Sequence, residues 1–192
     1  SILETGSRPK GGVGEIEIGV PSIGAESIVS LGNFDFSKTK HIPKEFFQKM
    51  KKGIVEDRDV LVYKDGGKPG YFIPHVTMFG DGFPFPEMAI NSHVYRLRAA
   101  DSLSQEYMYF YLSSKSIMQW MHLNGTGSAI PSIAREDLMR LPTLVPDPTI
   151  HNKFQYISSP IVTSILSLSK RNQVLRKTRD LLLPRLISGR LD

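Results

Sequence analysis

Lysines and arginines carried on glycine-rich loops are the residues of this sequence that point most directly to chemistry. Arg8 and Lys10 lie in residues 6–12, where five of the seven residues are Gly, Ser or Pro. Lys64 and Lys68 stand on either side of two glycines in a second loop. Such loops bring backbone amides and positive charge close to phosphate groups, although the first loop also fits an ordinary surface turn. The candidate phosphate-contacting residues of the two loops are Ser7, Arg8, Lys10, Lys64 and Lys68.

A run of lysines is the second basic feature. Six lysines between positions 38 and 52 are opposed only by Glu45. The run favours a patch that faces a polyanion, and a solvated, lysine-rich helix face explains it equally well. The candidates from this run are Lys38, Lys40 and Lys44. A third loop, residues 125–128, is polar and rich in glycine, and it adds Thr126 and Ser128.

Charge is distributed unevenly along the chain. The net charge is +5, but residues 1–147 hold 16 Lys/Arg against 17 Asp/Glu, a net of −1. Residues 148–192 hold 8 against 2, a net of +6. The first part is therefore balanced overall, and its basic residues form local patches. The last part is basic, and seven of its eight Lys/Arg residues lie between residues 170 and 190.

No catalytic constellation is recognisable. The five histidines show no i, i+3 or i, i+4 pairing, which a helical metal site would need. The Gly-x-Ser-x-Gly elbow and the Walker loop are absent, and so is the Asn/Asp-Pro-Pro-Tyr signature of adenine methyltransferases. We therefore predict no enzyme, no metal and no cofactor for the chain itself.

Length and composition set the broad class. The 192 residues suit one domain with an appendage, and 40% apolar content is enough for a core. The chain has no cysteine and hence no disulfide, and nothing resembles a signal peptide or a membrane-spanning run. We expect a cytoplasmic protein without membrane contact. The first residue is Ser, which suggests processing or a piece of a larger protein.

Scattered, non-repeating strands and helices indicate an α+β fold. Helices are expected at residues 43–52, 104–123 and 132–139. Residues 60–63 and 71–73 read as the two strands of a hairpin. Further strands are expected at residues 15–18, 89–97 and 141–145.

The final stretch, residues 147–183, reads as one long helix, roughly 50 Å at 1.5 Å per residue. Asp147 and Pro148 are a strong N-cap and first position, and Pro184 should end the helix. Apolar residues recur at steps of three and four, a heptad rhythm that predicts a coiled coil. A long core helix of the same domain is the alternative. The predicted interface consists of Phe154, Ile157, Ile161, Ile165, Leu168, Asn172, Leu175 and Leu182.

Pro160 complicates this helix, because it lacks an amide hydrogen and its ring clashes with the preceding turn. Either the helix kinks at this residue, or it ends near Ile157 and restarts with Ser159 as N-cap.

Four stretches together resemble one half of the DNA specificity subunit of a type I restriction–modification system. They are residues 6–9, residues 125–133 with 138–146, residues 152–154 and, most specifically, residues 175–191. The resemblance covers essentially the whole chain. It departs from the family at His151, where Gln is usual, and at Pro160.

The resemblance implies a definite organisation. Such subunits carry two target-recognition domains, each followed by a long helix, and the two helices pack antiparallel. Residues 1–146 would then be a recognition domain for one half of a bipartite double-stranded DNA site. Residues 147–192 would form the helix that pairs with a second half and docks the modification subunit. The chain would be either a natural half-subunit or the C-terminal half of a full subunit.

The resemblance also implies a non-catalytic protein. The chain would recruit the adenine-methylating modification subunit directly and the restriction subunit through it. S-adenosylmethionine, ATP and Mg would belong to those partners. Two alternatives remain: a coiled-coil assembly adaptor without direct DNA binding, and a nuclease or methyltransferase, against which the missing motifs argue. Neither the target sequence nor the base-contacting residues follow from the sequence.

Overall fold

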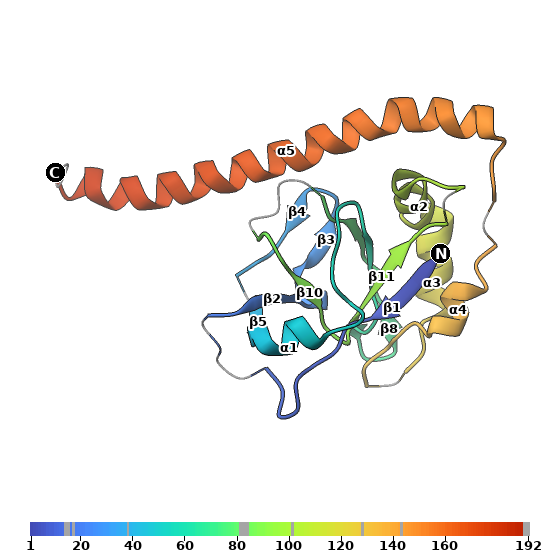
Figure 1. Cartoon of the computed structure of the whole chain (residues 1–192), viewed down its shortest axis with the longest axis horizontal. Coiled ribbons are helices and arrows are strands. Elements are labelled where there is room, and N and C mark those ends of the chain that lie inside the picture. The colour runs from blue at the N-terminus through green and yellow to red at the C-terminus, as the bar shows by residue number, and fades with distance from the viewer. Residues whose placement is uncertain are drawn as a thin grey trace.

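One long helix, α5 (Pro148–Ile187), runs over one side of a domain of mixed strands and short helices (Figure 1). The computed structural model describes residues 1–13, 16, 18–37, 39–80, 85–100, 102–127, 129–142 and 144–189. The predicted α+β class with a long C-terminal helix is confirmed. None of the helices in these ranges is both long and apolar enough to cross a membrane.

The central element is a four-stranded antiparallel sheet in the order β1-β11-β6-β9. Its middle strand, β6, has the apolar run Val60-Leu61-Val62, and all three side chains are fully buried. Val60 and Val62 pack into a core on one face, and Leu61 packs into a second core on the other. The sheet is covered on both faces, which is why the strand shows no alternation of polar and apolar residues. The strands are β1 (Ile2–Thr5), β6 (Val60–Tyr63), β9 (Val76–Met78) and β11 (Val94–Arg98).

Three smaller sheets surround the central one. The first joins β10, β2 and β5, with β10 parallel to β2 and β5 antiparallel to it. The second pairs β3 with β4, and the third is the hairpin of β7 and β8. Their bounds are β2 (Val20–Ile23), β3 (Ile28–Ser30), β4 (Asn33–Phe34), β5 (Lys40–Ile42), β7 (Gly67–Lys68), β8 (Tyr71–Phe72) and β10 (Ala89–Ile90).

Short helices connect these strands. They are the 3-10 turn η1 (Ala25–Ser27), α1 (Lys44–Lys49), α2 (Gln105–Leu112), α3 (Lys115–Asn124) and α4 (Arg135–Met139). The predicted single helix over residues 104–123 is wrong, because it divides at Ser113 and Ser114. Serine at these positions favours the division, since its side chain suits helix ends better than helix interiors.

Strand pairing differs from the prediction in several places. The predicted hairpin of residues 60–63 with 71–73 is wrong: β6 pairs with β9 and β11, while β8 turns back onto β7. The predicted strand 89–97 is two strands separated by a turn. No strand forms among the described residues of 141–145. The predicted strand 15–18 contains Glu15 and Glu17, which lie outside the described residues.

Helix α5 begins as predicted and ends later than predicted. Asp147 accepts a hydrogen bond from the Thr149 amide at 2.8 Å, which confirms the N-cap. The helix continues without a break through Pro160 and Pro184 to Ile187, so the predicted end at Leu183 is wrong. Pro160 and Tyr156 are both exposed, so water can bind the Tyr156 carbonyl that the proline leaves unpaired.

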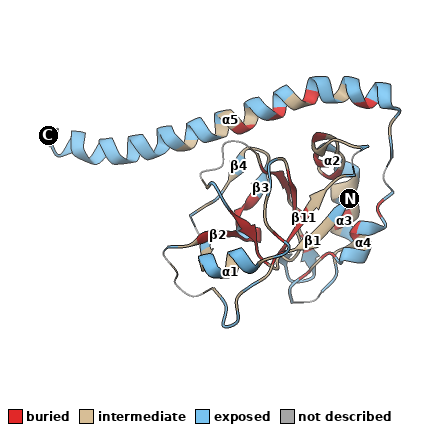
Figure 2. Ribbon diagram, in the orientation of Figure 1, coloured by how far each residue is buried: buried red, intermediate tan, exposed pale blue. Residues whose placement is uncertain are grey.

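The first half of α5 packs on the domain and the second half extends past it (Figure 2). The buried residues of α5 are His151, Ser158, Val162 and Leu166. The Ser169 hydroxyl donates to the Gly32 carbonyl at 2.6 Å, and the helix is exposed from Val174 onward. The alternative of a core helix therefore holds for the first half.

Candidate nucleic-acid interface

Several loops gather at the end of the domain that lies opposite α5. The loop after β1, helix α1, the β7–β8 hairpin and the loop between α3 and α4 all lie on the lower side of the view in Figure 1. We call this region the loop end. It carries exposed cations from distant parts of the sequence, namely Arg8, Lys10, Lys44, Lys49 and Lys68.

Backbone hydrogen bonds join the hairpin to the α3–α4 loop. The Gly66 amide donates to the Pro131 carbonyl at 2.8 Å, and the Ile133 amide donates to the Lys64 carbonyl at 3.0 Å. Thr126 and Ser132 exchange two further bonds, of 2.9 and 2.7 Å. Because three segments share one backbone network, we expect this part of the loop end to hold its shape when it meets a partner.

The predicted DNA-contacting residues fall into three groups. Arg8, Lys10, Lys44, Lys68 and Thr126 are exposed at the loop end, and Ser7 is partly buried there. Lys40 is exposed on β5, beside Thr39 and His41, which border a cleft under Arg176 of α5. Lys38 and Ser128 lie outside the described residues.

Lys64 differs from the other candidates because it already has partners. Its Nζ lies 3.7 Å from the Asp65 carboxylate, 3.5 Å from the Ser92 carbonyl and 5.9 Å from the centre of the Tyr95 ring. Asp65 also lies 2.7 Å from Nδ1 of His93. These contacts reduce the charge that Lys64 can offer to a phosphate, so Lys68 is the more available cation of the hairpin.

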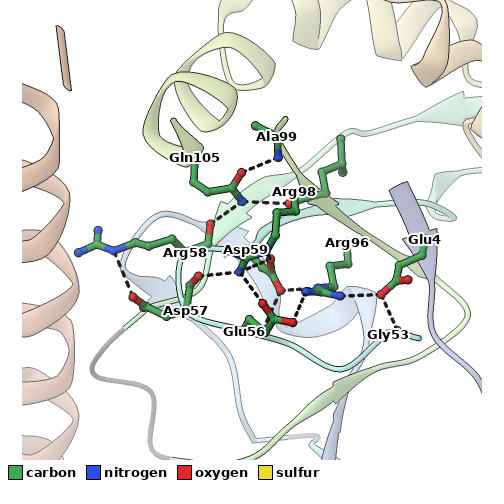
Figure 3. Close-up of polar contacts among 11 residues, drawn as sticks. Glu4, Gly53, Glu56, Asp57, Arg58, Asp59, Arg96, Arg98, Ala99 and Gln105 are labelled. Atoms are coloured by element: carbon green, nitrogen blue, oxygen red, sulfur yellow. Dashed lines mark hydrogen bonds and ion pairs between the residues drawn. The ribbon is translucent and has the colours of Figure 1, made fainter. Parts of the chain in front are cut away.

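An ionic network with Asp59 and Arg96 buried at its centre joins β11 to β1 and to the loop before β6 (Figure 3). Asp59 is 0% exposed and Arg96 is 5% exposed, and the Asp59 carboxylate accepts a hydrogen bond from Nε of Arg96. Glu4 accepts from Arg96 Nη1 at 2.7 Å and from the Gly53 amide at 2.7 Å. Arg98 Nε donates to the other Asp59 oxygen at 2.9 Å. The network thus ties β1 and β11 to the loops before β6.

The pKa directions in this network follow from burial and pairing. Burial raises the pKa of the Asp59 carboxyl, and the hydrogen bond from Arg96 offsets this only in part. Burial opposes the charge on Arg96, but hydrogen bonds to Asp59 and Glu4 outweigh it and leave the pKa of Arg96 above its ordinary value. Loss of either Asp59 or Arg96 would leave an uncompensated buried charge, which is strongly destabilising. We read the network as structural.

The network also reaches α5 through Arg58. This residue has a left-handed backbone, with φ of 66°, and its carbonyl accepts from Gln105 Nε2 at 2.9 Å. Its side chain points away from the network toward α5 (Figure 3), where Nη2 donates to Thr163 Oγ1 at 2.7 Å. Sequence reasoning assigned no role to Asp57, Arg58 or Asp59 and missed this connection. Two arginines at alternate positions of an apolar strand, Arg96 and Arg98, were the available signal.

The sequence and the structure were compared with those of known proteins. No family model matches the sequence. A segment of 110 residues is 27% identical to the Type I restriction enzyme MjaIX specificity subunit of Methanocaldococcus jannaschii. The resemblance to type I specificity subunits is confirmed. The segment covers 56% of this chain and 24% of that relative, so the chain matches about a quarter of the relative's length.

A solved structure was also found, described as "Structural basis underlying complex assembly and conformational transition of the type I R-M system". The alignment covers 98% of this chain and 44% of the solved chain, with 13% identity and a TM-score of 0.37. A score this low carries no argument about the fold.

The predicted coiled-coil residues lie along α5 and form a second surface of this chain. Ile157, Ile161, Leu168, Leu175 and Leu182 are between 46% and 65% exposed, and Asn172 is exposed beside them. Phe154 and Ile165 lie at the margin, partly buried against the domain. Phe154 makes edge-on ring contacts with Tyr107 and Phe110 of α2. The other stripe residues form a long, mostly apolar surface on α5 that the described residues of the domain leave exposed.

Proposed function

We propose that this chain is one recognition half of a type I specificity subunit. Residues 1–146 would read one half of a bipartite double-stranded DNA site, and residues 147–192 would pair with a second half and dock the modification subunit. The observation that carries the proposal is the sequence relationship to the specificity subunit of M. jannaschii. Since only a quarter of that relative is matched, the paired arrangement belongs to the proposal.

The exposed cations of the loop end support the DNA-binding part. Arg8, Lys10 and Lys68 are on loops or a hairpin, where side chains can reach phosphates without disturbing the core. Phosphate contacts of this kind fix the position of a protein on DNA but carry no sequence information. Base reading would come from polar side chains between the cations, such as Thr126.

The open stripe of α5 supports the pairing part. Large apolar side chains in a continuous exposed surface mark an interaction site, and their heptad spacing suits a second helix. A second copy of this chain, or the other half of a full subunit, would supply that helix in an antiparallel pair. The modification subunit would bind the assembled helices, and the restriction subunit would join through it.

In this proposal the chain has no catalytic role. Among the described residues no group of three or more His, Asp or Glu side chains is placed to hold a metal ion. The methyl donor, ATP and Mg would be bound by the partner subunits. The chain's contribution is to choose the DNA site and to set its geometry.

Salt dependence of DNA binding tests the proposal. The logarithm of the affinity for duplex DNA should fall linearly with the logarithm of salt concentration, with a slope of about −0.9 per phosphate neutralised. Replacing Arg8 and Lys68 together by Ala should flatten the slope by about 2 and weaken binding to all sequences alike. Lys64 is left intact because it contacts Asp65.

Lys153→Ala is the matched control, since this exposed lysine lies on α5, away from the loop end. It should leave both the slope and the affinity of the chain for DNA unchanged. Fluorescence anisotropy over a salt series measures all three proteins. An affinity that does not depend on salt would contradict the proposal, and no binding even at low salt would favour the assembly adaptor without direct DNA contact.

A further inference from the structure

We propose that Tyr71 and His122 form a base-reading pair at the loop end, beside Lys68 as a phosphate contact. This inference rests on the proposed DNA-binding function and assigns parts of the recognition surface to bases and to backbone. The ligand is double-stranded DNA, approached by the β7–β8 hairpin, which lies at the loop end in Figure 1.

The hairpin sorts its side chains into an inner and an outer face. Gly67 pairs with Phe72, and Phe72 is almost completely buried in the main core. Lys68 pairs with Tyr71, and both side chains are exposed. Directly opposed residues of an antiparallel pair place their side chains on the same face, so Lys68 and Tyr71 are presented outward together.

The turn that joins the two strands is short and stiff. Pro69 and Gly70 separate Lys68 from Tyr71, and Gly70 has a φ of 72°. Pro at the first central position and Gly with positive φ at the second are the signature of a type II turn. The Gly66 amide anchors the base of the hairpin to the Pro131 carbonyl. A side chain on this anchored hairpin loses little conformational entropy when it contacts DNA.

His122 of α3 fixes the position of the tyrosine ring. The two ring centres are 4.2 Å apart, at an angle of 54° between the ring planes. His122 Nδ1 lies 2.5 Å from the Phe72 carbonyl. A carbonyl can only accept, so Nδ1 carries the hydrogen and donates it, and Nε2 of the neutral ring is left as an acceptor.

The free polar groups of the pair suit a base edge. Tyr71 is 54% exposed, and within the described residues its hydroxyl has no hydrogen-bond partner, nor has His122 Nε2. An imidazole acceptor matches the amino group that adenine or cytosine presents in the major groove. The hydroxyl can donate or accept. The pair therefore favours a base pair that offers an exocyclic amino group at the position it faces.

Packing alone does not account for the hydroxyl. The ring of Tyr71 covers His122, which a phenylalanine would do equally well, whereas the phenolic oxygen bonds to nothing in the described part of the chain. Tyr71→Phe therefore separates the two roles, because it keeps the ring contact and removes only the group proposed to read DNA.

The test uses the chain assembled with its modification subunit and a DNA library with randomised half-sites. Tyr71→Phe should lower the preference at one base pair by about tenfold, the size of one lost base contact. His122→Asn, whose amide can replace the Nδ1 donor but not the Nε2 acceptor, should alter the same or the adjacent pair. Lys68→Ala should weaken binding at every sequence equally. The temperature of unfolding should stay the same in Tyr71→Phe.

The outcomes separate this inference from the proposed function. A changed preference at one or two neighbouring pairs, with the salt slope unchanged, supports the base-reading pair. An unchanged preference at every position in Tyr71→Phe and His122→Asn, while the wild-type complex still selects a sequence, overturns the pair and leaves the proposed function standing. A wild-type complex that selects no sequence at all overturns both.

Discussion

The two halves of α5 have the same heptad pattern and different surroundings. In residues 148–169, Val162 and Leu166 are 0% and 2% exposed, because they pack into the main core of the domain. In residues 170–187, Leu175 is 65% exposed. The near half has two apolar faces, one for its own domain and one left open. The far half has only the open face.

The geometry of the near half explains how both faces fit on one helix. Ser158 and Val162 each follow a stripe residue, Ile157 and Ile161, by one position. At 100° per residue the domain-facing side is roughly 100° away from the open stripe. The near half can therefore hold the domain on one side and a second helix on another. The far half carries an exposed apolar stripe, and its burial against another chain belongs to the proposal.

The largest expected effect is on association. Leu168→Asp with Leu175→Asp places two charges in the open stripe, so the protein should change from an associated state to monomers. The domain should remain folded, because neither residue packs in its core. Sedimentation measures the association and circular dichroism monitors the fold. A wild-type protein that is already monomeric at tens of micromolar, by rough estimate from coiled-coil affinities, would count against pairing.

A pair of matched truncations tests the comparison more finely. Leu166→Ala, in the near half, should lower the free energy of unfolding by about 2–5 kcal/mol, because it leaves a cavity in the main core. Leu175→Ala, in the far half, should change it by less than about 0.5 kcal/mol, as expected for a surface site. Both are made in a Leu168→Asp background, which should weaken association, and sedimentation checks that each variant is monomeric. Chemical denaturation gives the two values, and similar losses would mean that the far half also packs on the domain.

The sequence predicted which residues of α5 are apolar and where the helix begins, but not which surface covers them. Most of the heptad stripe is exposed on both sides of Ile165, and its pairing with a partner helix stays a prediction. The domain-facing side was missed because half of it is polar: His151 accepts from the Ser104 amide at 3.0 Å, and Ser169 bonds to Gly32. Ser104 and Gly32 lie far from α5 in the sequence, so no local sequence pattern predicts these hydrogen bonds.

In the candidate interface, too, the sequence predicted local features but not long-range contacts. Local chemistry identified the glycine-rich loops that carry cations, since glycine and proline act on the backbone within a few residues. It placed Lys64 at a hairpin tip, whereas β6 pairs with β9 and Lys64 is held by Asp65 and Ser92. Tyr71 was assigned to a return strand and was not recognised as an outward-facing side chain. Register decides which residues face out, and register depends on pairings across the sheet.

Inserting one heptad after Lys170 should change the stability of the domain least. It tests whether the far half of α5 sets the distance between the two recognition domains. The insertion follows the Ser169–Gly32 hydrogen bond and the buried residues of the near half, so the domain and the near half should keep their packing. Seven residues lengthen the helix by roughly 10 Å. In an antiparallel pair the two recognition domains would move apart by that distance. At about 3.4 Å per base pair, the spacer between the half-sites should grow by about three base pairs, with the half-site sequences unchanged.

A four-residue insertion at the same position is the control, because it lengthens the helix but does not keep the heptad register. It rotates the far part of the stripe away from its partner, so assembly and methylation should both fall. Mapping methylated adenines with each variant in complex with the modification subunit distinguishes the cases. If the heptad variant stays active on the original spacer, the far half does not set the distance between half-sites. The near half and its domain contacts would then have to position the recognition domains by themselves, through Arg58 and Thr163 among others.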